Sequence, residues 1–162
     1  MPDKIAVDCH EHTLMQENIP IGKVYGGRKF TFLKLPANLV RIDRVGGFFS
    51  KPGYNIVDHS TGSYLGCLEF TWRECIITLQ DKTVFYFHKD SSDKAFYKPS
   101  TWNKFRHEMT NSTDKIIFSG RINSAEIFDG SIETTNERLI LPMMIGIYIL
   151  EEKQRIRNEN AG

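Results

Sequence analysis

The chain has 162 residues, a length that suits one domain with a buried core. Hydrophobic residues make up 40% and charged residues 25%, which is typical of a globular protein. The formal net charge is +1, so no global electrostatic field directs the chain to nucleic acid or to a membrane.

The N-terminus begins Met-Pro-Asp-Lys and is not followed by a long apolar stretch, so no secretory signal is expected. Three cysteines, Cys9, Cys67 and Cys75, are an odd number without paired spacing. Both observations favour a reducing, cytoplasmic location.

Residues 1–20 show little sustained hydrophobic periodicity and are predicted to form an irregular N-terminal arm before a single domain over residues 21–162. In that domain, alternation of apolar and polar residues predicts a series of short strands separated by turn residues. The predicted strands are residues 29–35, 39–44, 54–58, 63–70, 74–79, 83–88, 95–98, 115–119 and 122–128.

Three local signals complete the β-rich part of the chain. Asp58 and Gly62 predict a hairpin turn, because Asp58 can accept backbone N–H bonds and Gly62 can adopt a positive φ. Residues 100–109 have helical spacing of apolar residues and are compatible with a short helix or an irregular edge. Asp129-Gly130 is predicted to be a turn.

The twelve residues from Leu139 to Leu150 carry no charge and no strongly polar side chain. A helix that is apolar on every side must be surrounded, and this one is too short to span a bilayer. Thr134 and Glu137 predict a capping box, and Pro142 either kinks the helix or lies in its first turn. The polar residues from Glu151 onward predict a helix end near Arg157.

These elements predict an all-β protein with one C-terminal helix, folded as a closed β-barrel or curled sheet around a buried apolar helix. A β-sandwich with the helix packed across one open face is the alternative architecture.

The order of elements resembles the tubby C-terminal domain and its relatives, the phospholipid scramblases and the LURP-one-related proteins. The resemblance covers about residues 21–157. It rests on the hairpin motif Tyr54-x-Ile56-x-Asp58-x-x-x-Gly62-x-x-Leu65-Gly66 and on the strand, turn, acidic cap and apolar helix of residues 122–152.

The resemblance implies a β-barrel around a hydrophobic helix and, for function, a binding module. Tubby domains bind phosphoinositide head groups through lysines and arginines, and scramblase-like members associate with membranes. No phosphoinositide motif can be matched residue by residue, so no binding site is carried over.

The most basic region runs from Lys23 to Lys29 and continues with Lys34, Arg41 and Arg44, interleaved with Tyr25 and Phe30. Such a surface can contact phosphates on a lipid head group or on nucleic acid, or it can be a solvated strand face. The predicted binding residues are Lys23, Arg28, Lys29, Arg41 and Arg44.

Cys9-His10-Glu11-His12 is the densest group of metal-ligand types in the sequence. Because neighbouring strand residues point to opposite faces, at most His10 and His12 would converge on a metal ion. A solvated N-terminal arm is the other interpretation of this segment.

Three functions follow from these features. The first is a non-enzymatic, membrane-peripheral binding module that contacts anionic lipid head groups or a protein partner and needs no cofactor, nucleic acid or transmembrane segment. The second is a metal-dependent enzyme that uses the Cys9, His10 and His12 cluster. The third is a carrier with an apolar ligand inside its barrel, against which the apolar helix argues because it fills that space.

Overall fold

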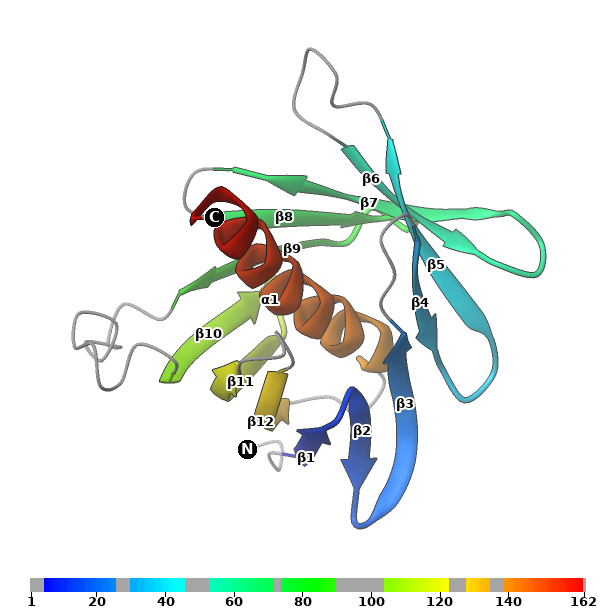
Figure 1. Cartoon of the computed structure of the whole chain (residues 1–162). Coiled ribbons are helices and arrows are strands. Elements are labelled where there is room, and N and C mark those ends of the chain that lie inside the picture. Colours follow the sequence, from blue (N-terminus) through cyan, green and yellow to red (C-terminus); the bar gives the residue numbers. More distant parts are fainter. Residues whose placement is uncertain are drawn as a thin grey trace.

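A computed structural model of the chain describes residues 5–25, 30–45, 53–71, 74–89, 104–122, 128–134 and 139–161. Within these ranges, twelve antiparallel strands form a closed barrel, and one helix, α1 (Ile140–Ala161), follows them (Figure 1). The strands are β1 (Ile5–His10), β2 (Thr13–Gln16), β3 (Ile19–Tyr25), β4 (Phe30–Lys34), β5 (Leu39–Val45), β6 (Gly53–Asp58), β7 (Tyr64–Phe70), β8 (Glu74–Leu79), β9 (Val84–Lys89), β10 (Lys104–Thr110), β11 (Lys115–Ile122) and β12 (Phe128–Thr134).

The strands follow one another around the barrel in chain order, and the barrel closes where β1 pairs with β12. At this seam Val7 lies opposite Ile132, and Cys9 lies opposite Gly130. Closure removes the unpaired strand edges that an open sheet would present. The predicted barrel with one C-terminal helix is therefore confirmed, and the sandwich alternative is wrong.

Helix α1 runs through the ring of strands (Figure 1). From Met143 to Leu150 the side chains are buried on every side of the helix, from 0% exposed at Ile145 and Ile149 to 6% at Tyr148. Each large apolar side chain that leaves water in this way contributes about 1.5–3 kcal/mol. The helix fills the interior of the barrel, which is the space that a carrier would need for its ligand.

Two glycines let the helix and the wall approach closely. A Cβ atom at Gly146 of α1 would overlap the Phe118 ring of β11. A Cβ atom at Gly22 of β3 would lie 2.7 Å from the sulfur of Met144. Glycine is therefore needed for space at Gly146, whereas the flexible Met144 side chain could move away from a Cβ atom at Gly22; neither glycine has a positive φ.

The predicted irregular arm over residues 1–20 is wrong from Ile5 onward, because β1, β2 and the start of β3 belong to the barrel. Two tight turns join these strands, one at Glu11-His12 and one at Glu17-Asn18, and all four residues have φ between 50° and 65°. Turns of this kind usually contain glycine, which marks them in a sequence. Because the strands are short and neither turn contains glycine, the sequence pattern does not reveal these hairpins.

Asp129-Gly130 is not a turn, because both residues lie within β12. Gly130 lies opposite Gly120 of β11 and Cys9 of β1. A Cβ atom at Gly130 would overlap the backbone of Ser119 and Gly120. The glycine therefore marks a close approach of two strands, which is the other common reason for glycine in a strand.

Several predicted boundaries also change. Residues 104–110 form strand β10 where a short helix or an irregular edge was expected. The strand predicted over residues 122–128 is replaced by the end of β11 and the start of β12, and residues 123–127 between them lie outside the described part of the chain. Residues 95–98 also lie outside it.

The predicted capping box is wrong in its first member. Thr134 is the last residue of β12, is 1% exposed and pairs with Ile5 and Ile116. Glu137 lies outside the described residues. The helix begins at Ile140, so Pro142 occupies its first turn, where the missing N–H has no helical partner in any case.

The predicted hairpin turn after β6 is confirmed. Gly62 has a φ of +74°. One carboxylate oxygen of Asp58 accepts the backbone N–H groups of Ser60 and Thr61 at 3.0 and 3.1 Å. These bonds help to hold the pKa of Asp58 below its usual value, after the larger effect of the Asn38 side chain.

Candidate functional site

The β1–β2 hairpin places neighbouring side chains on opposite sides of the barrel wall. Cys9 points inward and is 1% exposed, whereas His10 points outward and its side chain is 67% exposed. His12 lies in the turn with a φ of 65°, a conformation in which histidine is one of the less unusual residues. The hairpin therefore separates the potential ligands that the sequence places side by side.

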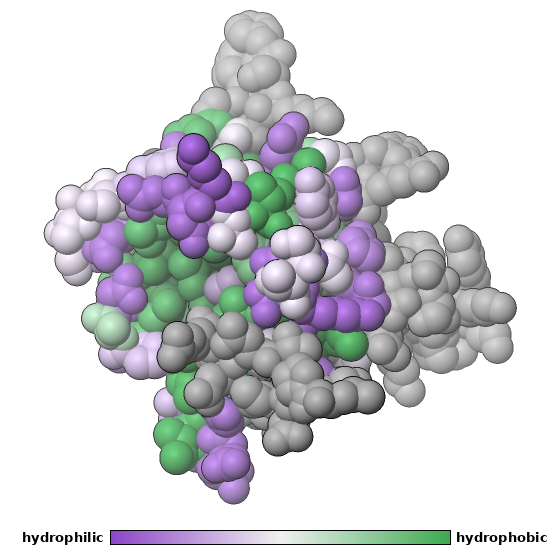
Figure 2. Space-filling model, turned by 180° about the vertical axis from the view of Figure 1, so that it is seen from behind, coloured by the Kyte–Doolittle hydropathy of each residue, from purple (hydrophilic) through white to green (hydrophobic). Residues whose placement is uncertain are grey.

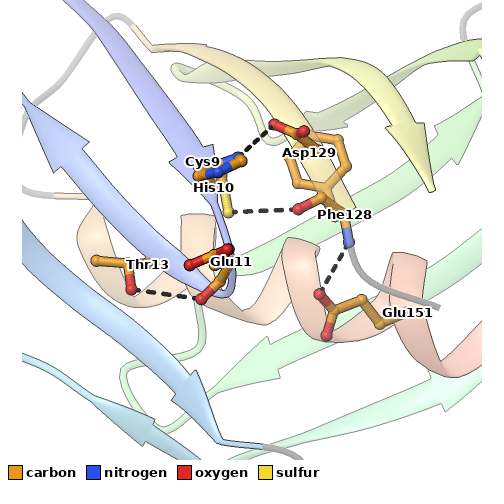
Figure 3. A network of polar contacts seen from close by, with 7 residues as sticks. All are labelled: Cys9, His10, Glu11, Thr13, Phe128, Asp129 and Glu151. Atoms are coloured by element: carbon orange, nitrogen blue, oxygen red, sulfur yellow. Dashed lines mark hydrogen bonds and ion pairs between the residues drawn. The ribbon is translucent and has the colours of Figure 1, made fainter. Parts of the chain in front are cut away.

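Each histidine contacts a different carboxylate. His10 Nδ1 lies 3.2 Å from Asp129 Oδ1 on the outside of β12 (Figure 3). His12 Nδ1 lies 3.1 Å from Glu151 Oε1, which comes from α1. This close contact with the Glu151 carboxylate raises the pKa of His12, and the negative charge of Glu151 adds to the effect, although the geometry at Nδ1 is not that of a hydrogen bond.

Glu151 also links the helix to the seam of the barrel. Its Oε1 accepts the backbone N–H of Phe128 at 3.1 Å, and its side chain is only 12% exposed (Figure 3). The Cys9 thiol lies nearby and donates to the Phe128 carbonyl at 4.0 Å. We call this group, made of Cys9, His12, Phe128 and Glu151, the Glu151 network.

Cys9 is a poor nucleophile at neutral pH. Burial, and then the negative charges of Glu151 and Asp129, raise the pKa of the Cys9 thiol to about 12. A thiol attacks carbon as the thiolate, which is scarcely populated under these conditions. None of the three cysteines forms a disulfide bond, as their spacing suggests.

The geometry gives no support to the metal-dependent enzyme. In the described part of the chain, no three His, Cys, Asp or Glu side chains converge so that they could hold a metal ion. His10 and His12 serve separate ion pairs, so they do not share a site. Because strand and turn place these residues, the segment is also not the solvated arm that the sequence suggests.

The structure does not gather all of the predicted basic residues on one surface. Lys23 and Arg41 point outward from β3 and β5, while Arg44, although exposed, lies opposite the buried Tyr54 and is therefore out of step with Arg41 along β5. Arg28 and Lys29 lie outside the described residues. The structure therefore brings Lys23 and Arg41 to one face, but not Arg44.

Arg41 is largely neutralised on this face. Its Nε and Nη2 atoms donate to the two carboxylate oxygens of Asp43 at 2.6 and 3.0 Å. Its Nη1 atom also lies 3.2 Å from Nδ1 of His59 in the β6–β7 turn. Such a two-pronged pair fixes the guanidinium in place and reduces its attraction for an external anion.

Strand register adds Lys34 to the predicted set. Lys23 and Lys34 are direct partners across β3 and β4, so their side chains leave the same face of the sheet. The next outward row contains Tyr25, Phe32 and Arg41. We call the surface made of Lys23, Tyr25, Phe32, Lys34 and Arg41 the basic face.

Two adjoining hollows cover the basic face. The smaller has a volume of about 300 Å³ and includes Lys23 in its wall. The larger has a volume of about 670 Å³ and includes Phe32, Leu39 and His59. Both are bordered by Tyr25, Lys34, Leu35 and Pro36.

The surface around these hollows is mixed in character. Figure 2 shows hydrophobic side chains reaching the surface among hydrophilic ones on the side of the molecule that β3, β4 and β5 occupy. Tyr25 is 41% exposed, and Lys23 Nζ lies 5.0 Å from the centre of its ring. Aromatic and cationic side chains therefore alternate here, as the sequence suggests for the wider basic region.

Comparisons with protein-family models, with curated proteins and with solved structures found no match. In the described part of the chain, no helix is long and apolar enough to cross a membrane.

Proposed function

We propose that the chain is a non-enzymatic binding module whose basic face holds an anionic group, with lipid head groups as the expected ligands. The resemblance to tubby-like proteins supports this proposal, because it implies both a barrel around a C-terminal helix and the recognition of anionic head groups by basic residues. A binding module also needs no catalytic group, and the Glu151 network supplies none.

The single observation that carries the proposal is the pairing of Lys23 with Lys34. Like charges directly opposite each other across two strands destabilise a sheet. Within the described residues, neither lysine has a carboxylate partner. A bound anion would remove this repulsion, and the two ammonium groups would give it two strong hydrogen-bond donors.

Flotation with vesicles tests the proposal. At low salt, the protein should float with vesicles of phosphatidylcholine and phosphatidylserine and should not float with phosphatidylcholine alone. Binding should weaken as salt is added, because salt screens exposed charges. Replacing both Lys23 and Lys34 with alanine should lower binding by about tenfold or more, since each basic residue near an anionic surface contributes about 1 kcal/mol.

A charge-matched double variant controls for the loss of two positive charges. Lys82 and Lys115 are exposed lysines of the β8–β9 turn and β11, away from the basic face. Lys82→Asn keeps a residue that tolerates the observed φ of 71°, and Lys115→Ala completes the pair. This control should bind like the wild type. Failure of the wild-type protein to bind anionic vesicles at low salt would contradict the lipid proposal and favour an acidic protein partner.

A further inference from the structure

The two hollows of the basic face differ in chemistry. Lys23 borders the smaller one, and Lys34 stands between the two. Beyond Lys34, the larger hollow is lined mainly by apolar side chains, namely those of Phe32, Leu35, Pro36 and Leu39. The two hollows share four bordering residues, so together they form a groove that is cationic at one end and apolar at the other.

Hydrogen bonds and ring packing fix the walls of the apolar end. The β4–β5 turn is closed by a hydrogen bond of 2.9 Å from the Leu35 N–H to the Asn38 carbonyl. The Asn38 side chain in turn donates to Asp58 at 3.2 Å. Phe32 packs edge-on against His59 with their ring centres 5.0 Å apart. Preformed walls reduce the entropy that a ligand must lose when it binds.

We propose that this groove binds a monomeric amphiphile with one alkyl chain and a phosphate monoester head group. This proposal rests on the proposed function, because it places the anion at the same two lysines. The phosphate lies between Lys23 and Lys34, and the chain lies over Phe32, Pro36 and Leu39. Charge complementarity selects the head group: a phosphate monoester carries a charge of about −1.5 to −2 at neutral pH, close to that of two ammonium groups, whereas a carboxylate carries −1.

The size of the groove agrees with such a ligand. The larger hollow has a volume of about 670 Å³ and is open to solvent on one side, so an alkyl chain can lie along its apolar wall. Burial of each methylene group should raise the affinity about fourfold, until the chain reaches the end of the groove. An additional methylene beyond that point should have no effect.

Calorimetric titration with ethyl, butyl, hexyl and octyl phosphate tests this expectation, with every ligand kept below its micelle concentration. Affinity should rise about fourfold per methylene and then level off. Octanoate should bind more weakly than octyl phosphate, and octyl glucoside and octyltrimethylammonium should bind least. Lys34→Ala should weaken all the phosphates by a similar factor, because it removes the contact with the head group.

The Phe32→Thr variant tests the apolar part of the groove independently of the anion site. It should flatten the dependence on chain length while ethyl phosphate binds as before. Tyr86→Thr, at an outward position of β9 that is 44% exposed, is the matched control and should keep the dependence. If Phe32→Thr fails to fold, Pro36→Ser makes the same test at an exposed position.

The outcomes distinguish this inference from the proposed function. Equal affinity for ethyl and octyl phosphate, together with binding to anionic vesicles, would contradict the proposal of an amphiphilic ligand. The proposal that the basic face binds an anion would then still stand. Equal affinity for octyl phosphate and octyl glucoside would overturn the role of the lysines. Binding to neither phosphates nor anionic vesicles would overturn both proposals.

Discussion

The Glu151 network and the basic face are both polar regions of the same barrel wall, but their charges are balanced differently. Glu151 is nearly buried and has two partners, the Phe128 N–H and the His12 ring. Lys23 is half-buried and Lys34 is exposed, and the two lie opposite each other as like charges. A buried polar group needs partners if the fold is to be stable, whereas exposed charges can stay uncompensated until a ligand arrives. This difference agrees with a stabilising role for the first region and with the binding role that we propose for the second.

The largest effect should come from breaking the enclosure that keeps Glu151 away from water. Ile145→Asp places a carboxylate at a helix position that is 0% exposed, and an unpaired buried charge costs at least several kcal/mol. The variant should be unfolded by circular dichroism at room temperature. Ile19→Asp, at a residue that is 63% exposed, should fold normally. A soluble Ile145→Asp variant with an unchanged melting temperature would contradict the enclosed helix.

Removing the carboxylate itself should have the next largest effect. Glu151→Ala leaves the Phe128 N–H without its acceptor, which costs about 1–3 kcal/mol of unfolding free energy. Glu151→Gln keeps an acceptor oxygen and should lose less. Urea unfolding measures both, with Glu69→Ala on the exposed side of β7 as the control. Equal stability of Glu151→Ala and wild type would show that the network does not hold the helix to the seam.

Lys34→Ala should act in the opposite direction on stability. It removes the repulsion with Lys23 and should raise the unfolding free energy by about 0.2–1 kcal/mol. Binding to anionic vesicles should fall about fivefold, as expected for one basic residue at an anionic surface. Urea unfolding and flotation on the same preparation report the two changes. A loss of both stability and binding would place Lys34 among the structural residues instead.

The smallest effect concerns pH. Because Glu151 raises the pKa of His12 in the folded state, protonated His12 favours folding. This contribution is complete below the ordinary histidine pKa of about 6.5 and is lost as pH rises through the higher folded-state value. His12→Asn keeps a residue that tolerates positive φ and should reduce the loss of stability over this range. His10→Asn is the control, and an identical pH dependence in all three proteins would contradict the role of His12.

Local pattern was enough to predict the middle of the barrel and the nature of the helix. In β5, Val40 and Ile42 alternate with Arg41 and Asp43, and this period of two defines a half-buried strand without knowledge of its neighbours. An unbroken apolar segment likewise has only one stable location, which is inside the protein.

The proposed binding residues and the Glu151 network depend on information that the local sequence pattern does not contain. The pairing of Lys23 with Lys34 is a matter of register across a hairpin, and a shift of one residue would place the two lysines on opposite faces. The contact between His12 and Glu151 requires the barrel to be closed and the helix to lie at a particular depth. The β1–β2 turn was hidden because Glu11 and His12 adopt a conformation that glycine or asparagine usually provides.

The seam between β1 and β12 has a consequence for how the chain reaches its folded state. The contact between Cys9 and Phe128 joins residues that are 119 positions apart, so the ring closes only after nearly all of the chain is available. Contacts over such distances slow folding, because the entropy of a long loop is lost before the contact forms. On the ribosome, α1 emerges after the twelve strands, so the apolar inner wall of the barrel stays uncovered until the helix has been synthesised. Until then, the first and last strands are open edges that can pair with other chains, and synthesis is the stage at which this protein is most exposed to aggregation.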